Sequence, residues 1–260
     1  MSESLSVSFS HLGEAVWRAD SLAGAAGATL TSGHTALDAQ LPGGGWPVGA
    51  VCEILQAHSE HNEWRLLLPA LKRAAGAAMV QSSALMLVGA PHVPFGPGLA
   101  AQGLDARRLV QVLASTPDER LWAAEQSLRC AAVQAVLAWL PQTRAEPLRR
   151  LQMAAHANNK LLFVMRPTQV RTESSPAVLR LLLASQPQSD ALLLHILKRR
   201  GRPLEQPLTL PADNVRLSVL LASGRSRVAC VASGPATARV WASDWLQGMP
   251  DAVGCIASAA

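Results

Sequence analysis

The sequence predicts an α/β domain in which a mostly parallel β-sheet is flanked by helices. Short apolar runs recur at intervals of roughly 25 to 30 residues with helical patterns between them, which is the spacing of βαβ units. The runs are nearly continuous rather than alternating, as expected for strands buried on both faces. Hydrophobic residues make up 49% of the 260-residue chain, enough for a sizeable core.

Five apolar runs are the predicted strands of this parallel sheet: residues 51–55, 85–88, 109–113, 133–139 and 161–165. Two further runs, 178–183 and 191–197, flank the polar segment SQPQSD. This arrangement predicts an antiparallel hairpin at the edge of the sheet.

Three helices are indicated between the strands. A helical pattern begins at Glu63, with apolar residues recurring on one face. Thr116 and Glu119 form a T-x-x-E capping box, which predicts the start of a second helix. Thr143 and Glu146 repeat this motif and predict the start of a third.

The chain divides into an N-terminal arm (1–27), a core (28–203) and a C-terminal extension (204–260) with short strand candidates at 215–221 and 228–231. The arm carries a predicted helix over 12–22 and is separated from the core by AGAAGA, a flexible composition. Leu12, Trp17 and Arg18 are candidate partner contacts on this helix. A helix folded back onto its own core is the alternative.

Composition narrows the class of protein. The net charge of +5 permits contact with nucleic acid or an acidic protein surface. The four cysteines are far apart, so we expect reduced thiols and neither a zinc site nor a disulfide framework. No signal peptide and no membrane span is indicated. These features predict a cytoplasmic protein without membrane contact.

The loop after the first predicted strand stands where a phosphate-binding loop normally lies. Its sequence between Gln56 and Trp64 is QAHSEHNEW, which has no glycine and no lysine but two glutamates. Like charge facing a triphosphate is unfavourable, so we expect a degenerate loop and no cofactor. The loop residues concerned are Gln56, His58, Ser59, His61, Asn62 and Glu63. The two histidines lack a further clear ligand, so no metal site is expected.

Several blocks of the chain carry a resemblance. They are VWRADSLA (16–23), LPGGGWP (41–47), EWRLLLPAL (63–71), PHVPFGPGLAAQGLD (91–105), LWAAEQSLR (121–129), AVLAWLP (135–141) and LKRRGRPL (197–204). From about residue 31 to 203 the chain resembles the core of RecA-like recombinases. The blocks together are similar to the ImuA family, the recombinase-related proteins of bacterial mutagenesis cassettes. The resemblance implies a RecA-like fold.

The resemblance also implies where catalytic groups would stand. The loop lysine of an active recombinase falls at about Asn62 and its Ser or Thr at Glu63. The Mg²⁺-side aspartate falls at Ala138 or Trp139, the water-activating glutamate near Pro91, and the nucleotide-sensing glutamine at Arg166. Phosphoryl transfer needs each of these groups, so we expect a pseudo-ATPase without catalytic residues.

The partners implied by the resemblance are those of SOS-induced translesion DNA synthesis. They are the polymerase-like protein ImuB, an error-prone DNA polymerase III alpha-type subunit and, as a third candidate, the RecA recombinase, with nucleoid association after DNA damage. A second resemblance, to SulA-type cell-division inhibitors that bind the division-ring protein, is the alternative.

Two further surfaces are candidates for partner or DNA contact. The first is the cation run Lys198, Arg199, Arg200 and Arg202, which would bind DNA weakly and with strong salt dependence. A solvated strand end is the alternative for these cations. The second is Trp46, which follows three glycines and is either an exposed anchor residue or partly buried under its loop.

Overall fold

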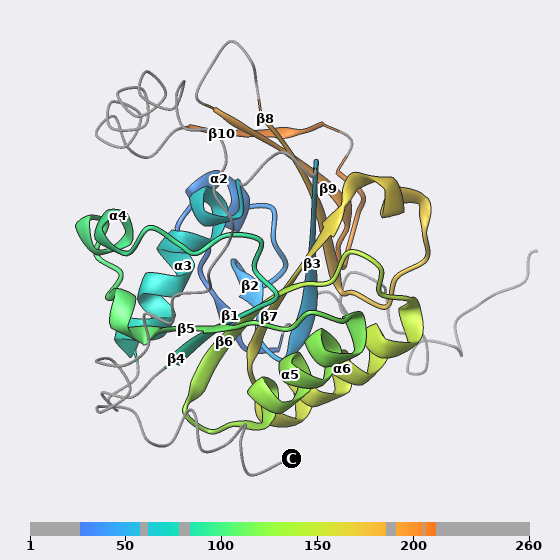
Figure 1. Ribbon diagram of the computed structural model, residues 1–260. Coiled ribbons are helices and arrows are strands. Elements are labelled where there is room, and N and C mark those ends of the chain that lie inside the picture. Colours follow the sequence, from blue (N-terminus) through green and yellow to red (C-terminus); the bar gives the residue numbers. More distant parts are fainter. Residues whose placement is uncertain (1–26, 58–61, 78–83, 186–190, 205, 212–260) are drawn as a thin grey trace, which may run out of the picture.

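The computed structural model describes residues 27–57, 62–77, 84–185, 191–204 and 206–211. Figure 1 shows one twisted sheet with helices packed on both of its faces. The predicted α/β class is therefore confirmed. The N-terminal arm with Leu12, Trp17 and Arg18, the loop residues His58, Ser59 and His61, and the strand candidates beyond residue 211 lie outside the described residues.

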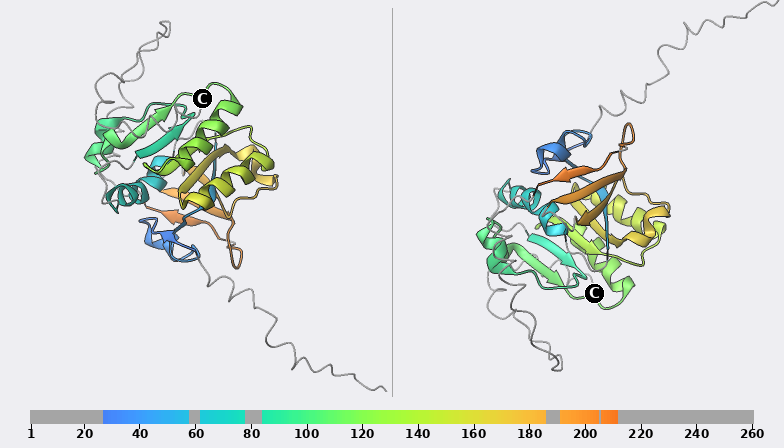
Figure 2. Two further views of the ribbon diagram at one scale, coloured as in Figure 1. Left: turned by 90° about the horizontal axis from the view of Figure 1, so that it is seen from below. Right: turned by 90° about the horizontal axis from the view of Figure 1, so that it is seen from above.

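The main sheet has eight strands in the order β10-β9-β8-β3-β7-β6-β4-β5. Their bounds are β3 Ala50–Gln56, β4 Ala84–Val88, β5 Leu109–Val112, β6 Val133–Trp139, β7 Leu161–Pro167, β8 Leu179–Ser185, β9 Leu192–Lys198 and β10 Leu208–Leu210. The strands from β8 to β5 in this order pair in parallel, whereas β9 is antiparallel to both of its neighbours. In both views of Figure 2, β9 and β10 (orange) lie at the opposite end of the sheet from β4 and β5.

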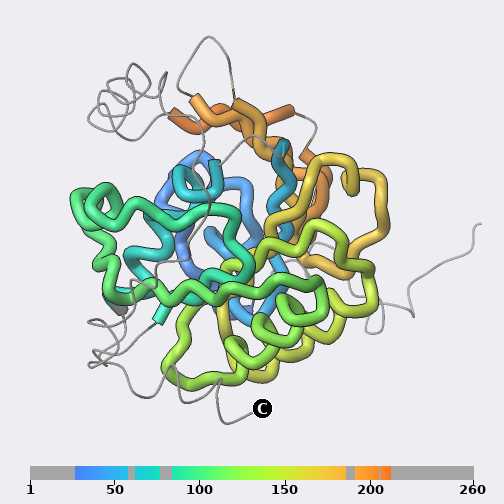
Figure 3. The backbone as a smooth tube through the Cα atoms, in the orientation of Figure 1, coloured from blue at the N-terminus to red at the C-terminus, as the bar shows by residue number. Residues whose placement is uncertain are grey.

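The helices connect these strands. They are α2 Thr35–Asp38, α3 Glu63–Ala77, α4 Gly96–Ala101, α5 Pro117–Arg129 and α6 Ala145–Asn158, with two 3₁₀ turns, η1 Ala106–Arg108 and η2 Thr168–Thr172. A small ribbon of β1 Thr29–Leu30 and β2 Trp46–Pro47 precedes the sheet. The tube in Figure 3 shows how segments far apart in the sequence, such as β3 and β7, run side by side.

Two apolar layers hold the sheet between its helices. In β7, Leu161, Phe163 and Met165 face the layer that contains α2 and α3. Leu162 and Val164 face the layer formed with α5 and α6. Because successive side chains of a strand point to opposite faces, an unbroken apolar run is what a strand covered on both sides requires.

The predicted hairpin is confirmed as β8 and β9, but it does not form the edge of the sheet. Strand β10 pairs with β9 through Leu208, Thr209 and Leu210. The sheet thus continues past residue 203, the core boundary expected from sequence. Strand β10 was not predicted because a three-residue strand gives too short an apolar pattern to be recognised.

Only one of the two predicted capping boxes is present. Thr116 Oγ1 accepts a hydrogen bond from the Glu119 N–H at 3.2 Å, and the Glu119 carboxylate accepts one from the Thr116 N–H at 3.0 Å. The prediction of a second box at Thr143 is wrong, because α6 begins at Ala145 with Arg144 as an N-cap that makes no side-chain capping bond.

Two predictions for Trp46 are wrong: that it is an exposed residue in contact with a partner, and that it is only partly buried. Its side chain is fully buried and meets the Phe163 ring edge-on, with the ring centroids 5.2 Å apart. Gly45 makes this possible, since a Cβ there would lie 2.3 Å from the Leu30 carbonyl oxygen. The ribbon closes tightly over the core and carries the indole inward with it.

Candidate functional site

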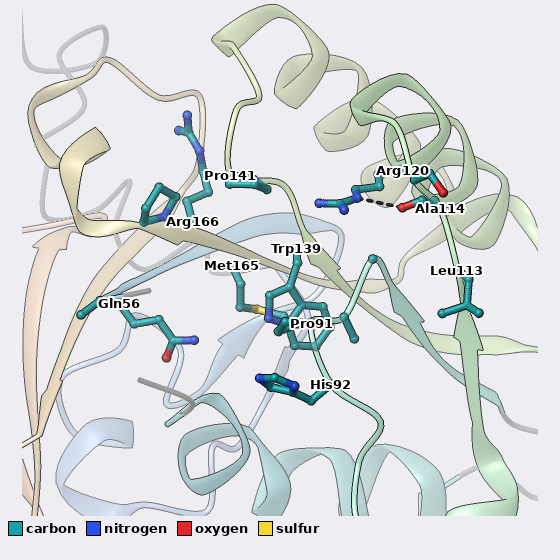
Figure 4. Close-up of a pocket in the computed structure, with 15 residues that line it drawn as sticks. Gln56, Pro91, His92, Leu113, Ala114, Arg120, Trp139, Pro141, Met165 and Arg166 are labelled. Carbon is teal, nitrogen blue, oxygen red and sulfur yellow. Dashed lines mark hydrogen bonds between the residues drawn. The ribbon is translucent and has the colours of Figure 1, made fainter. Parts of the chain in front are cut away.

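A cavity of about 720 Å³ lies at the carboxyl ends of the parallel strands β3, β4, β5, β6 and β7. Figure 4 shows the side chains that converge on it from these strand ends and from α5. Ligands of open α/β sheets bind at this end of the strands, so the position of the cavity makes it the candidate site.

The cavity is lined by residues from each strand at which recombinase chemistry is expected. Gln56 comes from the end of β3, Pro91 follows β4, Trp139 ends β6 and Arg166 lies near the end of β7. The topology thus brings together positions spread over more than one hundred residues. None of these four side chains is a carboxylate that could anchor a metal ion or activate a water.

The start of α3 is fastened to the end of β3 by buried polar side chains. Gln56 Nε2 donates to the Glu63 carboxylate at 2.7 Å, and the Asn62 N–H donates to Gln56 Oε1 at 3.3 Å. Asn62 Nδ2 donates to Ser185 Oγ at 2.8 Å. Gln56, Asn62 and Glu63 are buried, so their hydrogen bonds satisfy polar groups at the junction of β3 and α3.

A buried ionic cluster lies beside the cavity and was missed by sequence reasoning. Glu53 accepts from Arg166 Nη1 at 3.2 Å and from Arg180 Nε at 2.6 Å. Arg166 Nη2 also donates to the Glu173 carboxylate at 3.1 Å and to the Thr143 carbonyl at 2.6 Å. The positive charge of Arg166 is therefore neutralised within the protein. The only sequence signal was a lone glutamate in the apolar run VCEIL.

Arg180 also fixes the loop that follows β7. Its Nη2 donates to the Val170 carbonyl at 3.0 Å, and its Nη1 donates to the Glu173 carbonyl at 2.9 Å. These bonds hold η2 against the sheet and join it to the Glu53 carboxylate through one side chain. The loop after β7 is thereby tied to β8 by hydrogen bonds from one buried side chain.

Arg120 on α5 also lines the cavity and lies across Pro141 from Arg166 (Figure 4). Its Nε donates to the Ala114 carbonyl at 3.0 Å. Gly89, at the end of β4, has a φ of +64°, and a Cβ on it would lie 2.8 Å from Arg120 Cδ. A glycine at this position therefore leaves the space that the arginine side chain occupies.

The predicted cation run lies away from the cavity, and its residues differ in their contacts. Lys198 Nζ donates to the Ser175 carbonyl at 2.9 Å. Arg199 donates to the backbone carbonyl of Gln40 and, through Nε, to that of Arg202 at 2.8 Å. Arg200 and Arg202 have exposed side chains. Arg199 thus fastens the turn after β9 to the segment after α2, while Arg200 and Arg202 face solvent.

In the part of the chain that the structure describes, no group of three or more His, Cys, Asp or Glu side chains is placed to hold a metal ion. Among the same residues, no helix has the length and apolar content needed to cross a bilayer.

Complete burial raises the pKa of the Cys52 thiol, which keeps it protonated and unreactive.

Comparison with known proteins finds two relatives of the same kind. The chain is 34% identical over 104 residues to the cell division inhibitor SulA of Edwardsiella piscicida, covering 40% of this chain and 60% of that protein. It is 30% identical over 132 residues to the cell division inhibitor SulA of Photorhabdus laumondii, covering 50% of this chain and 67% of that protein. No protein-family model matches the chain.

Proposed function

Because the chain belongs to the superfamily that includes the SulA cell division inhibitors, we propose that it is a non-catalytic, RecA-like accessory protein of the SOS response. In this proposal it acts as a scaffold in error-prone translesion DNA synthesis. Its partners are the polymerase-like protein ImuB, an error-prone DNA polymerase III alpha-type subunit and the RecA recombinase, and its place in the cell is the nucleoid after DNA damage.

The observation that carries the proposal is the composition of the cavity. Where a working recombinase needs a metal-binding carboxylate and a water-activating glutamate, this chain has Trp139 and Pro91 at the cavity wall. Arg166 is committed to Glu53 and Glu173. Phosphoryl transfer depends on charge neutralisation and metal anchoring, and these side chains supply neither.

A second function, inhibition of cell division by binding the division-ring protein, is favoured by the relatives themselves, since both are cell division inhibitors. The blocks at 16–23 and 197–204 favour the mutagenesis scaffold instead, through their resemblance to the ImuA family. In both proposals the protein acts by binding another protein and needs no nucleotide.

Nucleotide binding and hydrolysis test the non-catalytic part of the proposal. We expect isothermal titration of the purified full chain with ATP and Mg²⁺ to give no binding heat, and phosphate release to match the buffer blank. An ATPase rate that is abolished by Asn62→Ala or Glu63→Gln would refute this expectation. Met153→Ala, an exposed change on α6, is the control for a contaminating ATPase.

Cell phenotypes separate the two functions. If the scaffold proposal is correct, deletion of the gene lowers damage-induced mutation frequency, and overproduction of the protein leaves cell length unchanged. If the protein is a division inhibitor, overproduction produces filaments and deletion leaves the mutation frequency unchanged. The frequency of resistant colonies after ultraviolet irradiation and the cell length by microscopy measure these outcomes.

A further inference from the structure

Three large apolar side chains are exposed, one at the cavity and two in the loop that follows β4. Leu113, which lines the cavity, is 83% exposed. In the loop after β4, His92 lines the cavity and is followed by Val93 and Phe95, which are 78% and 74% exposed. These three residues, the apolar rim, are among the most exposed large hydrophobic residues of the described chain. Exposed apolar residues that form a patch mark a binding surface more often than single, scattered apolar residues do.

The loop that presents two of them is restrained. Pro91, Pro94 and Pro97 each fix a backbone φ angle, and α4 begins directly after Phe95. The backbone that carries the two exposed side chains therefore has little conformational freedom. A surface ordered in advance loses little conformational entropy on binding.

The hollow is elongated rather than a single chamber. A second hollow of about 170 Å³ shares Ser115, Arg120 and Pro141 with the large cavity and extends towards Thr143. Arg120 lies where the two meet. A small molecule in the large cavity would leave the apolar rim and the second hollow uncovered, whereas an extended polypeptide segment could occupy both.

The charge of the site selects an acidic occupant. None of the described residues that line either hollow is Asp or Glu. Arg166 is neutralised by Glu53 and Glu173, but Arg120 makes no ion pair with a described carboxylate and bonds only through Nε to a backbone carbonyl. Its terminal guanidinium nitrogens are thus available to a carboxylate.

We infer that the cavity and its rim bind an extended, acidic segment of a partner protein. In this arrangement an apolar side chain of the segment enters the cavity beside Leu113 and Trp139, and a neighbouring carboxylate pairs with Arg120. The inference rests on the proposed function only in requiring a protein partner, and it applies equally to a mutagenesis partner and to a division partner.

Synthetic peptides test this inference on the purified full chain. One fluorescein-labelled pool carries a central Leu, Met, Phe or Trp flanked by Asp and Glu, and a matched pool carries the same central residues flanked by Lys and Arg. We expect fluorescence polarisation to show saturable binding of the acidic pool only. Arg120→Ala and Leu113→Glu should each weaken this binding about tenfold or more, the loss expected when one charge-assisted hydrogen bond or one apolar contact is removed.

Met153→Glu on α6 is the matched control, because Met153 is exposed but does not line the cavity, and it should leave binding unchanged. If Arg120→Ala fails to fold, Leu113→Glu still decides the test, since that side chain lies in solvent. Equal binding of both pools, no binding of either, or binding that neither cavity variant alters would overturn the inference. Retention of inorganic pyrophosphate, and of no peptide, with the same Arg120 dependence would overturn it in favour of a small-anion site.

The peptide test and the search for cellular partners can fail separately. A failed peptide test alongside recovery of a mutagenesis partner from cells would reject this surface and leave the scaffold function intact. A positive peptide test alongside recovery of no such partner would reject the scaffold function and leave the surface intact.

Discussion

The substitution Glu53→Gln should destabilise the protein more than its small change in shape suggests. Glu53 is the single carboxylate between Arg166 and Arg180, at 3.2 Å from one guanidinium and 2.6 Å from the other. The side chains of all three residues are almost fully buried, with exposures of 0%, 2% and 8%. Glutamine keeps one acceptor oxygen but turns an N–H₂ group towards one of the arginines.

The magnitude follows from this burial. Removing one partner of a buried ion pair leaves an uncompensated charge and costs about 3–5 kcal/mol of unfolding free energy. A domain of this size has a total stability of about 5–15 kcal/mol, so the variant should lose a large share of it. Glu173→Gln removes the other carboxylate of the cluster, but that side chain is 56% exposed, so its loss should stay below about 1 kcal/mol.

Urea unfolding at neutral pH, followed by tryptophan fluorescence and by circular dichroism, measures both values. We expect the midpoint for Glu53→Gln to fall well below that of the wild type and that for Glu173→Gln to stay close to it. A loss of less than about 1 kcal/mol for Glu53→Gln would show that the buried cluster does not contribute as its geometry implies. Equal losses for the two variants would contradict the argument from burial.

Three further predictions concern stability. Trp46→Ala should lower the unfolding free energy by about 3–5 kcal/mol, measured in urea, because it empties a fully buried site. Hydrogen bonds from the backbone N–H groups of Thr116 and Ser115 lower the pKa of Glu119. Its charge therefore stabilises the fold above the ordinary pKa of about 4.3, and thermal melts of wild type and Glu119→Gln should converge as the pH falls below that value. Arg199→Ala should cost about 1 kcal/mol in the same urea assay, since it removes a bond to a backbone carbonyl across the fold.

The elements of the parallel sheet could be predicted from the sequence because each is a local pattern. Strands β3, β4, β5, β6 and β7 each match a predicted apolar run to within two residues at either end, and the first capping box places the start of α5 within one residue. Strand β10 and the β1–β2 ribbon could not be predicted, because two or three residues give no measurable periodicity. Their existence depends on partners elsewhere in the fold.

The candidate site was only partly predictable. The resemblance assigned chemistry near Pro91, at Ala138 or Trp139 and at Arg166, and the fold places Pro91, Trp139 and Arg166 around one cavity. Asn62 and Glu63, the other assigned positions, are not among its lining residues. The partners of Arg166 were out of reach of sequence reasoning, since Glu53 lies 113 residues away and reads as part of an apolar strand. Contacts across such distances depend on strand order, which local patterns do not encode.

The burial of Trp46 shows the same limit at short range. Three glycines before a tryptophan fit an exposed loop and a closed turn equally well. The closed turn forms because Gly45 lies against the Leu30 backbone and the indole packs against the Phe163 ring. Neither contact is visible in the segment itself.

The central claim is that the protein is a scaffold of error-prone DNA synthesis. It is tested most directly by identifying the proteins that it binds in its own cells. The full chain, tagged and expressed at its natural level, would be purified by affinity from DNA-damaged cells and its partners identified by mass spectrometry. The proposal predicts recovery of ImuB together with the error-prone polymerase subunit or the RecA recombinase. Recovery of the division-ring protein without any of these would contradict it and would assign the protein to the control of cell division.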